Sequence, residues 1–213
     1  MSTLLVFASE AEAEGAGSLE WETMTTGVGK TAAALALARR LGRGPRPALV
    51  VVAGVAGAYP DRHTVSEIVP ASLGAVYLVA RDRLADEGVA TEAGFLSLDA
   101  LGLSGPGSLS ADEDWTQALA RTLGLDVVDG VTVSTCSGNE ELSAQRGAAG
   151  AALETMEGAS FAAVCQSFGV PMVQLRSVSN LTGDRERARW DLPAALSSLR
   201  RELERLRALG GVP

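Results

Sequence analysis

Short apolar segments alternate along the chain with longer segments in which apolar residues recur at helical spacing. Runs of β-type residues predict strands at 4–8, 20–26, 48–53, 66–70, 75–80, 127–134, 151–156 and 170–178. Helical periodicity predicts helices at 30–41, 112–123, 140–148, 157–168 and 192–209. This alternation is typical of an α/β fold, in which helices cover both faces of a parallel or mixed sheet.

Two of the predicted helices carry clear end signals. Gly169 and Pro171 follow the fourth helix, because a glycine can adopt the left-handed conformation there and a proline cannot continue the helix. Asp191 is expected to cap the last helix, with Pro193 in its first turn. This helix has a stripe of leucines on one face, which we expect to pack on the sheet.

The length and composition favour a protein with one core. A chain of 213 residues, 46% of them hydrophobic, is expected to form a single domain over residues 1–213. The formal net charge of −8 does not favour a nucleic-acid partner, which would need a clustered basic face. No apolar run is long enough to span a membrane, so no membrane partner is expected.

The supply of cysteine and histidine is small. Cys136, Cys165 and His63 cannot make a disulfide framework, and their spacing matches no zinc site, so we expect no metal and no organic cofactor. Both cysteines are expected to be core residues of a cytoplasmic protein, and His63 is expected in a surface loop. The first residues lack a basic segment and soon meet Glu10, so no signal peptide is expected.

A glycine-rich segment, residues 27–31, precedes the first predicted helix. It ends in Gly-Lys-Thr like a phosphate-binding P-loop, but Met24 stands where the first glycine of that motif belongs. It also fits the start of a dinucleotide-binding motif, but no acidic residue follows the next strand to bind a ribose. A tight strand-to-helix turn explains these glycines better than either cofactor.

Small and acidic residues follow two other predicted strands. Gly54–Gly57 is either a tight turn or a place where a ligand lies close to the backbone, and the second interpretation is favoured because ligands of α/β proteins bind at strand ends. Glu10, Glu12 and Glu14 follow the first strand, and one of them could act as a general base on water. The residues themselves do not decide which one.

The ends of two further strands carry Met156 with Glu157 and Ser179 with Asn180. A lone Glu157 would most simply be a favourable anion in the first turn of a helix. Here Glu157 stands beside the thioether of Met156, and the other strand end adds the hydroxyl of Ser179 and the amide of Asn180. Together these groups suit a ribose and a purine base. The sequence therefore predicts an enzyme that acts on a small-molecule nucleoside.

Taken in order, these segments resemble the nucleoside phosphorylase/nucleosidase superfamily. The resemblance covers nearly the whole chain and is carried by residues 8–12, 26–30, 53–57, 156–159, 176–180, 183–185 and 190–193. Residues 89–95 and the segment at Trp190 are similar to the branch that hydrolyses futalosine. The resemblance implies a three-layer α/β/α sandwich with a mixed central sheet. It also implies a homodimer or higher homo-oligomer with a neighbour near the active site.

The resemblance also implies roles for particular residues. Glu12 would activate the attacking water, Glu157 would bind the ribose hydroxyls, and Met156 would lie against the sugar. Ser179 would orient its neighbour Asn180, which would face N7 of the purine. Gly54 is expected at the substrate. Phe95, Phe161 or a backbone segment is expected to contact the base, because Ser137, Gly138 and Asn139 offer no aromatic ring there.

Position 180 gives the sharpest indication of the substrate. By the resemblance, the members of the superfamily that cleave adenosine-type nucleosides have aspartate at this position, whereas this chain has Asn180. An amide can donate to a 6-oxo group and accept from a protonated N7, so it fits hypoxanthine better than adenine. Thr155, where the methylthioadenosine branch often has glutamate, also disfavours that branch.

The predicted function is therefore hydrolysis of futalosine with release of hypoxanthine, in the route to menaquinone that the resemblance implies. Three alternatives remain: a methylthioadenosine/S-adenosylhomocysteine nucleosidase, a purine nucleoside phosphorylase, and a ligand-binding protein without catalytic activity. Asn180 argues against the first, Glu12 argues for water in place of phosphate, and the joint presence of Glu12, Glu157 and Asn180 argues against the third.

Overall fold

The computed structural model describes residues 2–16, 20–60, 62–63, 68–69, 72–103, 109–183 and 190–209. The helices of this part are α1 (Glu10–Ala16), α2 (Lys30–Arg43), α3 (Glu113–Leu123), α4 (Glu140–Ala148), α5 (Gly158–Phe168) and α6 (Leu192–Ala208). Its longer strands are β1 (Thr3–Phe7), β3 (Leu49–Ala58), β6 (Val76–Leu84), β10 (Val127–Thr132) and β12 (Met172–Leu181). Its shorter strands are β2 (Glu22–Thr25), β4 (Arg62–His63), β5 (Ile68–Val69), β7 (Gly88–Thr91), β8 (Gly94–Ser97), β9 (Leu109–Ser110) and β11 (Leu153–Thr155).

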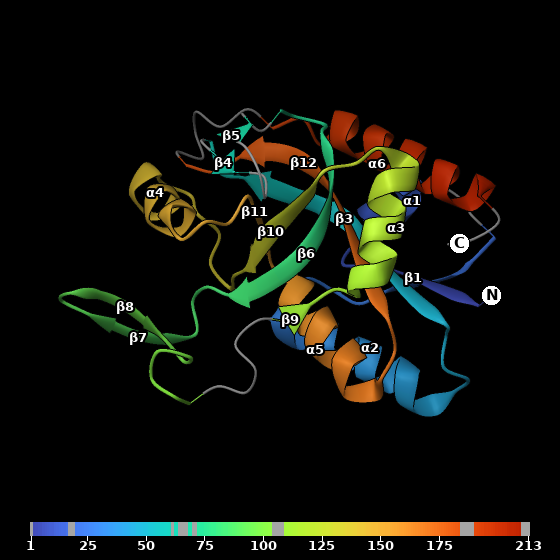
Figure 1. Ribbon diagram of the computed structural model, residues 1–213, viewed down its shortest axis with the longest axis horizontal. Coiled ribbons are helices and arrows are strands. Elements are labelled where there is room, and N and C mark those ends of the chain that lie inside the picture. The colour runs from blue at the N-terminus through green and yellow to red at the C-terminus, as the bar shows by residue number, and fades with distance from the viewer. Residues whose placement is uncertain are drawn as a thin grey trace.

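The central sheet is mixed and has the strand order β11-β10-β6-β12-β3-β1-β2, with β9 added beside β6. Strands β1, β2, β3 and β12 run parallel to one another, whereas β6 runs antiparallel to β12. Figure 1 shows the long strands β3, β6 and β12 crossing the middle of the molecule. The mixed character of the sheet agrees with the sequence prediction.

One end of the sheet closes on itself. The last residues of β3 pair with β11 in antiparallel fashion, Ala58 with Leu153 and Gly57 with Glu154. Because β11 also pairs with β10, the strands β3, β12, β6, β10 and β11 form a closed ring. The carboxyl ends of several strands are thereby brought close together at one end of the ring.

Helices cover both faces of the sheet, as the alternation of side chains along β1 shows. Leu5 and Phe7 belong to a core with side chains of α3 and α6, whereas Leu4 and Val6 belong to a core with side chains of α2 and α5. Figure 1 shows α3 and α6 on one side of the strands and α2 with α5 on the other. The predicted three-layer α/β/α sandwich is therefore confirmed.

The local predictions at helix ends and on α6 are also confirmed. Gly169 caps α5 in the left-handed conformation with φ 63°, and Asp191 accepts a hydrogen bond from the Ala194 N–H at the start of α6. Leu199 and Leu203 of α6 are buried against the sheet, together with Leu206. No helix among the described residues is both long and apolar enough to cross a membrane.

Several sequence predictions are wrong. Glu10–Ala16, expected as a loop, forms the short helix α1, and β7 and β8 form a hairpin that was not predicted. The strand predicted at 48–53 is longer than expected, because β3 continues through Gly54–Gly57 to Ala58, held by β12 and β11, which excludes the less favoured turn there. Cys136 is exposed, because it follows β10 in the loop beyond the sheet edge, whereas Cys165 is buried as predicted.

Some predictions fall outside what the structure describes. His63 lies in β4, and its side chain is outside the described part. The turn-rich segment 102–107 is typical of a surface loop, but only its first two residues are described. Residues 184–185 of the superfamily motif are not described.

Candidate active site

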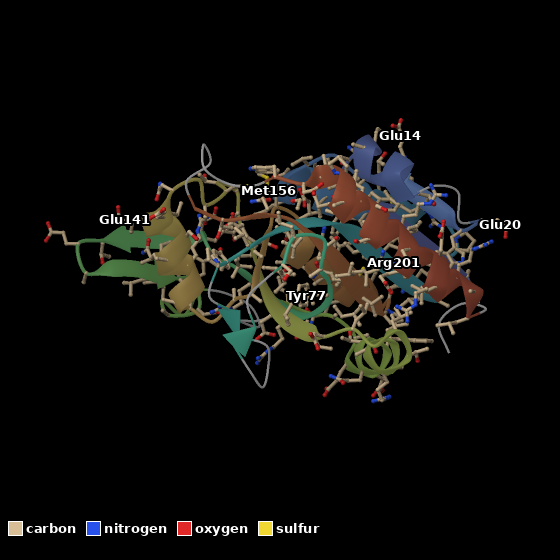
Figure 2. The ribbon with its side chains drawn as sticks, turned by 90° about the horizontal axis from the view of Figure 1, so that it is seen from above. Glu14, Glu20, Tyr77, Glu141, Met156 and Arg201 are labelled. Atoms are coloured by element: carbon tan, nitrogen blue, oxygen red, sulfur yellow. The ribbon has the colours of Figure 1, made fainter. Side chains whose placement is uncertain are left out.

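A cavity of about 310 Å³ opens at the carboxyl ends of β1, β3, β11 and β12. Ligands of α/β proteins usually bind at this edge of a sheet. The cavity also borders α1 and the first turns of α6, and Figure 2 labels Met156 beside α6. The predicted residues that line it are Glu12, Met156, Glu157, Ser179 and Asn180.

Glu12 is the one carboxylate of α1 that faces this cavity. Its side chain is 7% exposed, whereas Glu10 and Glu14 on the same helix are exposed to solvent. Glu12 Oε2 accepts hydrogen bonds from the Ser9 N–H and hydroxyl, both at 3.0 Å, and Oε1 accepts from the Val55 N–H at 2.9 Å. These donors fix the carboxylate in one orientation, so the structure distinguishes among three glutamates that the sequence could not separate.

Glu12 and a buried arginine, Arg176, both approach the backbone at Gly54. A Cβ atom at this position would lie 2.5 Å from Glu12 Oε1 and 2.7 Å from Arg176 NH1. The close approach predicted at Gly54 is therefore made by the side chains of Glu12 and Arg176, which lie against the backbone of β3. Only glycine leaves room for both groups.

Arg176 is a candidate site residue that the sequence analysis did not single out. It lies in β12, is 1% exposed and is the largest of the fully buried side chains. A buried cation costs much free energy unless anions or acceptors surround it. The signal was present in the sequence, since Arg176 is the only charged residue in the predicted strand 170–178.

Glu157 immediately precedes α5 and is 5% exposed. Its Oε1 accepts a hydrogen bond of 2.8 Å from the Gly29 N–H. Burial raises the pKa of Glu157, and the charge of Glu12 adds to this rise, whereas the Arg176 charge and the Gly29 N–H oppose it. An anion at this place, beside a second carboxylate, is suited to stabilise a positive charge that develops between them.

The glycine-rich segment 27–31 has its role at this carboxylate. Gly27 and Gly29 adopt positive φ angles of 89° and 99°, which place the Gly29 N–H toward Glu157 before α2 begins at Lys30. The expected strand-to-helix turn is confirmed. The Gly29 N–H of this turn donates a hydrogen bond to the Glu157 carboxylate.

Asn180 and Ser179 form a hydrogen-bonded pair at the end of β12. The Ser179 hydroxyl lies 2.9 Å from Asn180 Oδ1 and 3.3 Å from the Ala56 carbonyl, and its one proton is donated chiefly to the nearer Asn180 oxygen. Asn180 Nδ2 donates to the Leu181 carbonyl at 3.1 Å. Each end of the amide is thus used once and keeps capacity for one more partner, an acceptor at Nδ2 and a donor at Oδ1.

The structure places the aromatic residues differently from the sequence prediction. Phe161 is fully buried in the core between the sheet and α2, so it does not reach the cavity. Phe95 lies in β8 and lines a separate cavity beside α4. Trp190, which the sequence analysis used only as a family marker, lines the site and pairs through its backbone with Asn180.

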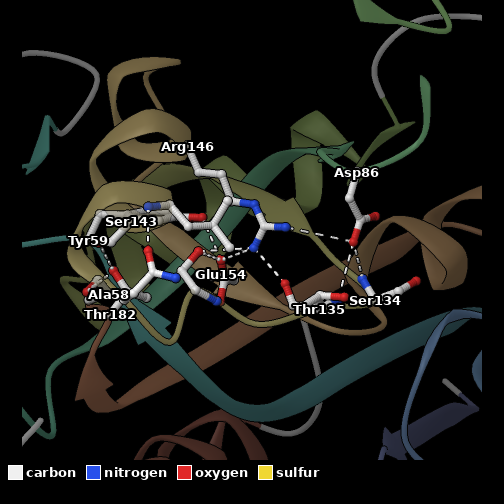
Figure 3. A network of polar contacts seen from close by, with 12 residues as sticks. Ala58, Tyr59, Asp86, Ser134, Thr135, Ser143, Arg146, Glu154 and Thr182 are labelled. Atoms are coloured by element: carbon white, nitrogen blue, oxygen red, sulfur yellow. Dashed lines mark hydrogen bonds and ion pairs between the residues drawn. The ribbon is translucent and has the colours of Figure 1, made fainter. Parts of the chain in front are cut away.

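A buried polar network holds the loop after β10 against the cavity (Figure 3). Glu154 in β11 accepts hydrogen bonds from the Ser137 N–H at 2.7 Å, the Ser137 hydroxyl at 2.5 Å and the Tyr59 hydroxyl at 2.8 Å. Arg146 of α4 forms an ion pair with Glu154 at 3.1 Å and donates to the Thr135 carbonyl. Since Ser137 lines the cavity, this network fixes one of its walls.

Asp86 extends the same network toward α2. Its carboxylate accepts from the Ser134 and Thr135 N–H groups at 2.6 and 3.2 Å and forms an ion pair of 2.5 Å with Lys30. Burial would raise the pKa of Asp86, but Lys30 and these N–H groups outweigh it and hold the pKa low. Among the described residues, no group of three histidine, cysteine or acidic side chains could hold a metal ion.

A sequence profile of the phosphorylase superfamily matches residues 23–210. The chain belongs to the phosphorylase superfamily. A futalosine hydrolase of Thermus thermophilus is 38% identical over 192 residues, which cover 88% of this chain and 81% of that protein. Within this superfamily, the chain belongs to the futalosine hydrolase family.

Solved structures share the fold at lower sequence identity. A futalosine hydrolase mutant of Helicobacter pylori superposes with a TM-score of 0.75 at 16% identity, over 98% of this chain and 100% of that one. A methylthioadenosine/S-adenosylhomocysteine nucleosidase of Colwellia psychrerythraea, in complex with adenine, gives 0.75 at 21% identity, over 100% and 96%. At these identities the likeness concerns the fold, so the substrate must be argued from the site.

Proposed function

We propose that this protein hydrolyses the N-glycosidic bond of futalosine, releasing hypoxanthine and the remaining sugar derivative, dehypoxanthine futalosine. The observation that carries the proposal is Asn180, whose amide is oriented by Ser179 at the wall of the cavity. Its remaining donor and acceptor match a 6-oxopurine, and the identity to a futalosine hydrolase supports the same substrate. The pathway implied by that substrate is menaquinone biosynthesis.

The ribose is proposed to lie between Met156 and Glu157. Glu157 accepts hydrogen bonds from the ribose hydroxyls, and Met156, which lines the cavity, lies against the sugar ring. As the bond from C1′ to the base nitrogen breaks, positive charge builds up on the ribose. The buried carboxylate of Glu157 stabilises that charge more strongly in this water-poor place than it would in solvent.

Glu12 is proposed to activate the attacking water. The carboxylate accepts a proton from water as the water oxygen bonds to C1′ and the electron pair of the broken bond leaves with the base. Arg176, whose NH1 approaches Gly54 as Glu12 Oε1 does, helps to bind the same water. Asn180 cannot supply a proton, so solvent water protonates the departing hypoxanthine while Oδ1 accepts from the protonated N7.

Trp190 is proposed to contribute the aromatic surface that the loop after Cys136 lacks. Its indole lines the cavity at the strand end that also carries Asn180. Aromatic contacts of this kind contribute about 0.5–1.5 kcal/mol beyond the burial of area. This places a ring near the substrate without requiring Phe161.

The active form is proposed to be a homo-oligomer in which a neighbour lies near the site. The β7–β8 hairpin exposes Val89, Phe95 and Leu96, which are 48%, 39% and 43% exposed. Such a group of apolar side chains is typical of a protein interface. Phe95, which lies away from the cavity of its own chain, would then contact the substrate of the neighbour.

A base-release assay tests the function directly. The protein is incubated with futalosine, inosine or methylthioadenosine, with and without phosphate, and the free base is separated by chromatography. We expect hypoxanthine from futalosine at a rate independent of phosphate. Preferred release of adenine from methylthioadenosine, or a strict need for phosphate, would contradict the proposal in favour of a nucleosidase of the methylthioadenosine type or a phosphorylase.

A further inference from the structure

A chain of buried polar side chains extends away from Arg176, and the proposed reaction uses only the arginine. This polar chain consists of Asp82, Gln174 and Arg176, each 1% exposed. Asp82 comes from β6, and the other two share one face of β12. Three polar side chains buried together need a reason, because each must find partners to offset its lost hydration.

Gln174 links the Asp82 carboxylate to the Arg176 guanidinium by hydrogen bonds. Its Oε1 accepts from Nε and NH2 of Arg176, each at 3.2 Å, and its Nε2 donates to Asp82 Oδ2 at 3.2 Å. An amide can accept from a guanidinium and donate to a carboxylate at the same time. The hydrogen bonds use the Nε and NH2 edge of the guanidinium and leave NH1 as the nitrogen that approaches Gly54, which Glu12 Oε1 approaches as well.

The Asp82 carboxylate is itself fixed from the far side. The Thr132 hydroxyl donates to Asp82 Oδ1 at 2.9 Å and accepts from the Ala159 N–H at 2.8 Å. A Cβ atom at Gly158 would overlap Asp82 Oδ2 and lie 2.6 Å from Gln174 Oε1. The start of α5, which directly follows Glu157, therefore packs against the same polar chain.

We propose that Asp82 and Gln174 are positioning residues that hold the Arg176 guanidinium at Gly54, beside Glu12, in the geometry that binds the attacking water. The inference rests on the proposed hydrolysis and adds to it the side chains that set the place of the arginine. A rigid support matters because small displacements of groups around a reacting atom reduce the rate strongly. Asp82 and Gln174 act through Arg176 and do not touch the substrate.

The first test replaces Gln174 by Met, which has a similar length but neither donates nor accepts as an amide does. We expect Gln174→Met to lower kcat for futalosine by about 10²-fold while KM changes little, because the lost interaction acts on the transition state. The matched control is Val173→Ala, whose side chain lies in the core on the opposite face of β12. It should lower the melting temperature but keep kcat near that of the wild type.

The second test exchanges the amide of Gln174 and the carboxylate of Asp82 between the two positions. Gln174→Glu places two carboxylates in contact, so it should lower kcat strongly. Combining it with Asp82→Asn restores one amide and one carboxylate in the reverse order, and we expect the double variant to regain most of the lost kcat. Asp82→Asn is also measured alone, so that its own effect can be separated.

Three results would overturn the inference: wild-type kcat in Gln174→Met, an equal loss of kcat in Val173→Ala, or a double variant no better than Gln174→Glu. Failure of the proposed function looks different, because the wild-type protein would then release no hypoxanthine from futalosine. The same variant ratios are therefore also measured with whichever of inosine and methylthioadenosine the wild type cleaves. A loss confined to the Gln174 variants on any of these substrates supports the positioning role.

Discussion

Replacing Glu12 by Gln removes the proposed base and keeps its shape. A general base contributes about 10²- to 10⁴-fold to a rate, so kcat should fall by that factor. The corresponding rise of the activation barrier is about 3–5 kcal/mol. Binding of hypoxanthine should persist, because Asn180 and the loop after β10 are not changed by this substitution.

The same substitution has a predictable cost in stability. Both Glu12 oxygens accept backbone N–H groups, one from Ser9 and one from Val55. Whichever way the new amide turns, its NH₂ group faces one of these donors, and the unsatisfied contact costs about 1–3 kcal/mol. In a chain of this size each kcal/mol lowers the melting temperature by about 2–4 °C.

The assay combines steady-state hypoxanthine release, calorimetric binding of hypoxanthine and thermal unfolding. Glu14→Gln is the matched control, because it makes the same chemical change on an exposed position of α1 and should alter none of the three. The reasoning would be refuted if Glu12→Gln kept more than a tenth of the wild-type kcat. It would also be refuted if the Glu14 control lost activity to the same extent.

Three further predictions follow from the site. Asn180→Asp should lower hypoxanthine release from futalosine, because a carboxylate cannot donate to the 6-oxo group; unchanged kcat/KM would contradict the proposed base recognition. Gly54→Ala should lower kcat by about 10²-fold or more, since its methyl group would lie 2.5 Å from Glu12 Oε1, and a fully active variant would show that the two side chains can move apart. Burial raises the pKa of Asp82 to about 6 in the folded protein. The folded state therefore binds this proton more tightly than the unfolded state, and the free energy of unfolding falls as the pH rises from about 4 to 6. Urea unfolding between pH 4 and 8 should show Asp82→Asn gaining up to about 3 kcal/mol relative to wild type over that range, and a constant difference would argue against this shift.

The sequence was sufficient for the features that depend on periodicity and on strand ends. Apolar alternation located the long strands and helices, and strands that end together brought Met156, Glu157, Ser179 and Asn180 to one edge. These inferences succeed because they use local patterns that the fold repeats. The choice among purines, argued from the single amide of Asn180, stays a prediction.

The sequence was insufficient where a residue acquires its role from distant partners. Glu12 could not be separated from Glu10 and Glu14 by the residues alone, because only packing buries one of them. The continuation of β3 through Gly57 depends on pairing with β11 and β12, which lie far away in sequence. Arg176 gave a signal as a charged residue within a predicted strand, but its place beside Gly54 of β3 and Glu12 of α1 depends on the fold.

The closure of the sheet by β3 and β11 has a consequence for the order of folding. The contact between Tyr59 and Glu154, at this closure, joins residues 95 positions apart. Contacts between such distant segments form slowly, because a long loop must be ordered before they can be made. During refolding, enzymatic activity should therefore recover later than helical circular dichroism, and the step that separates the two should be the closing of this ring.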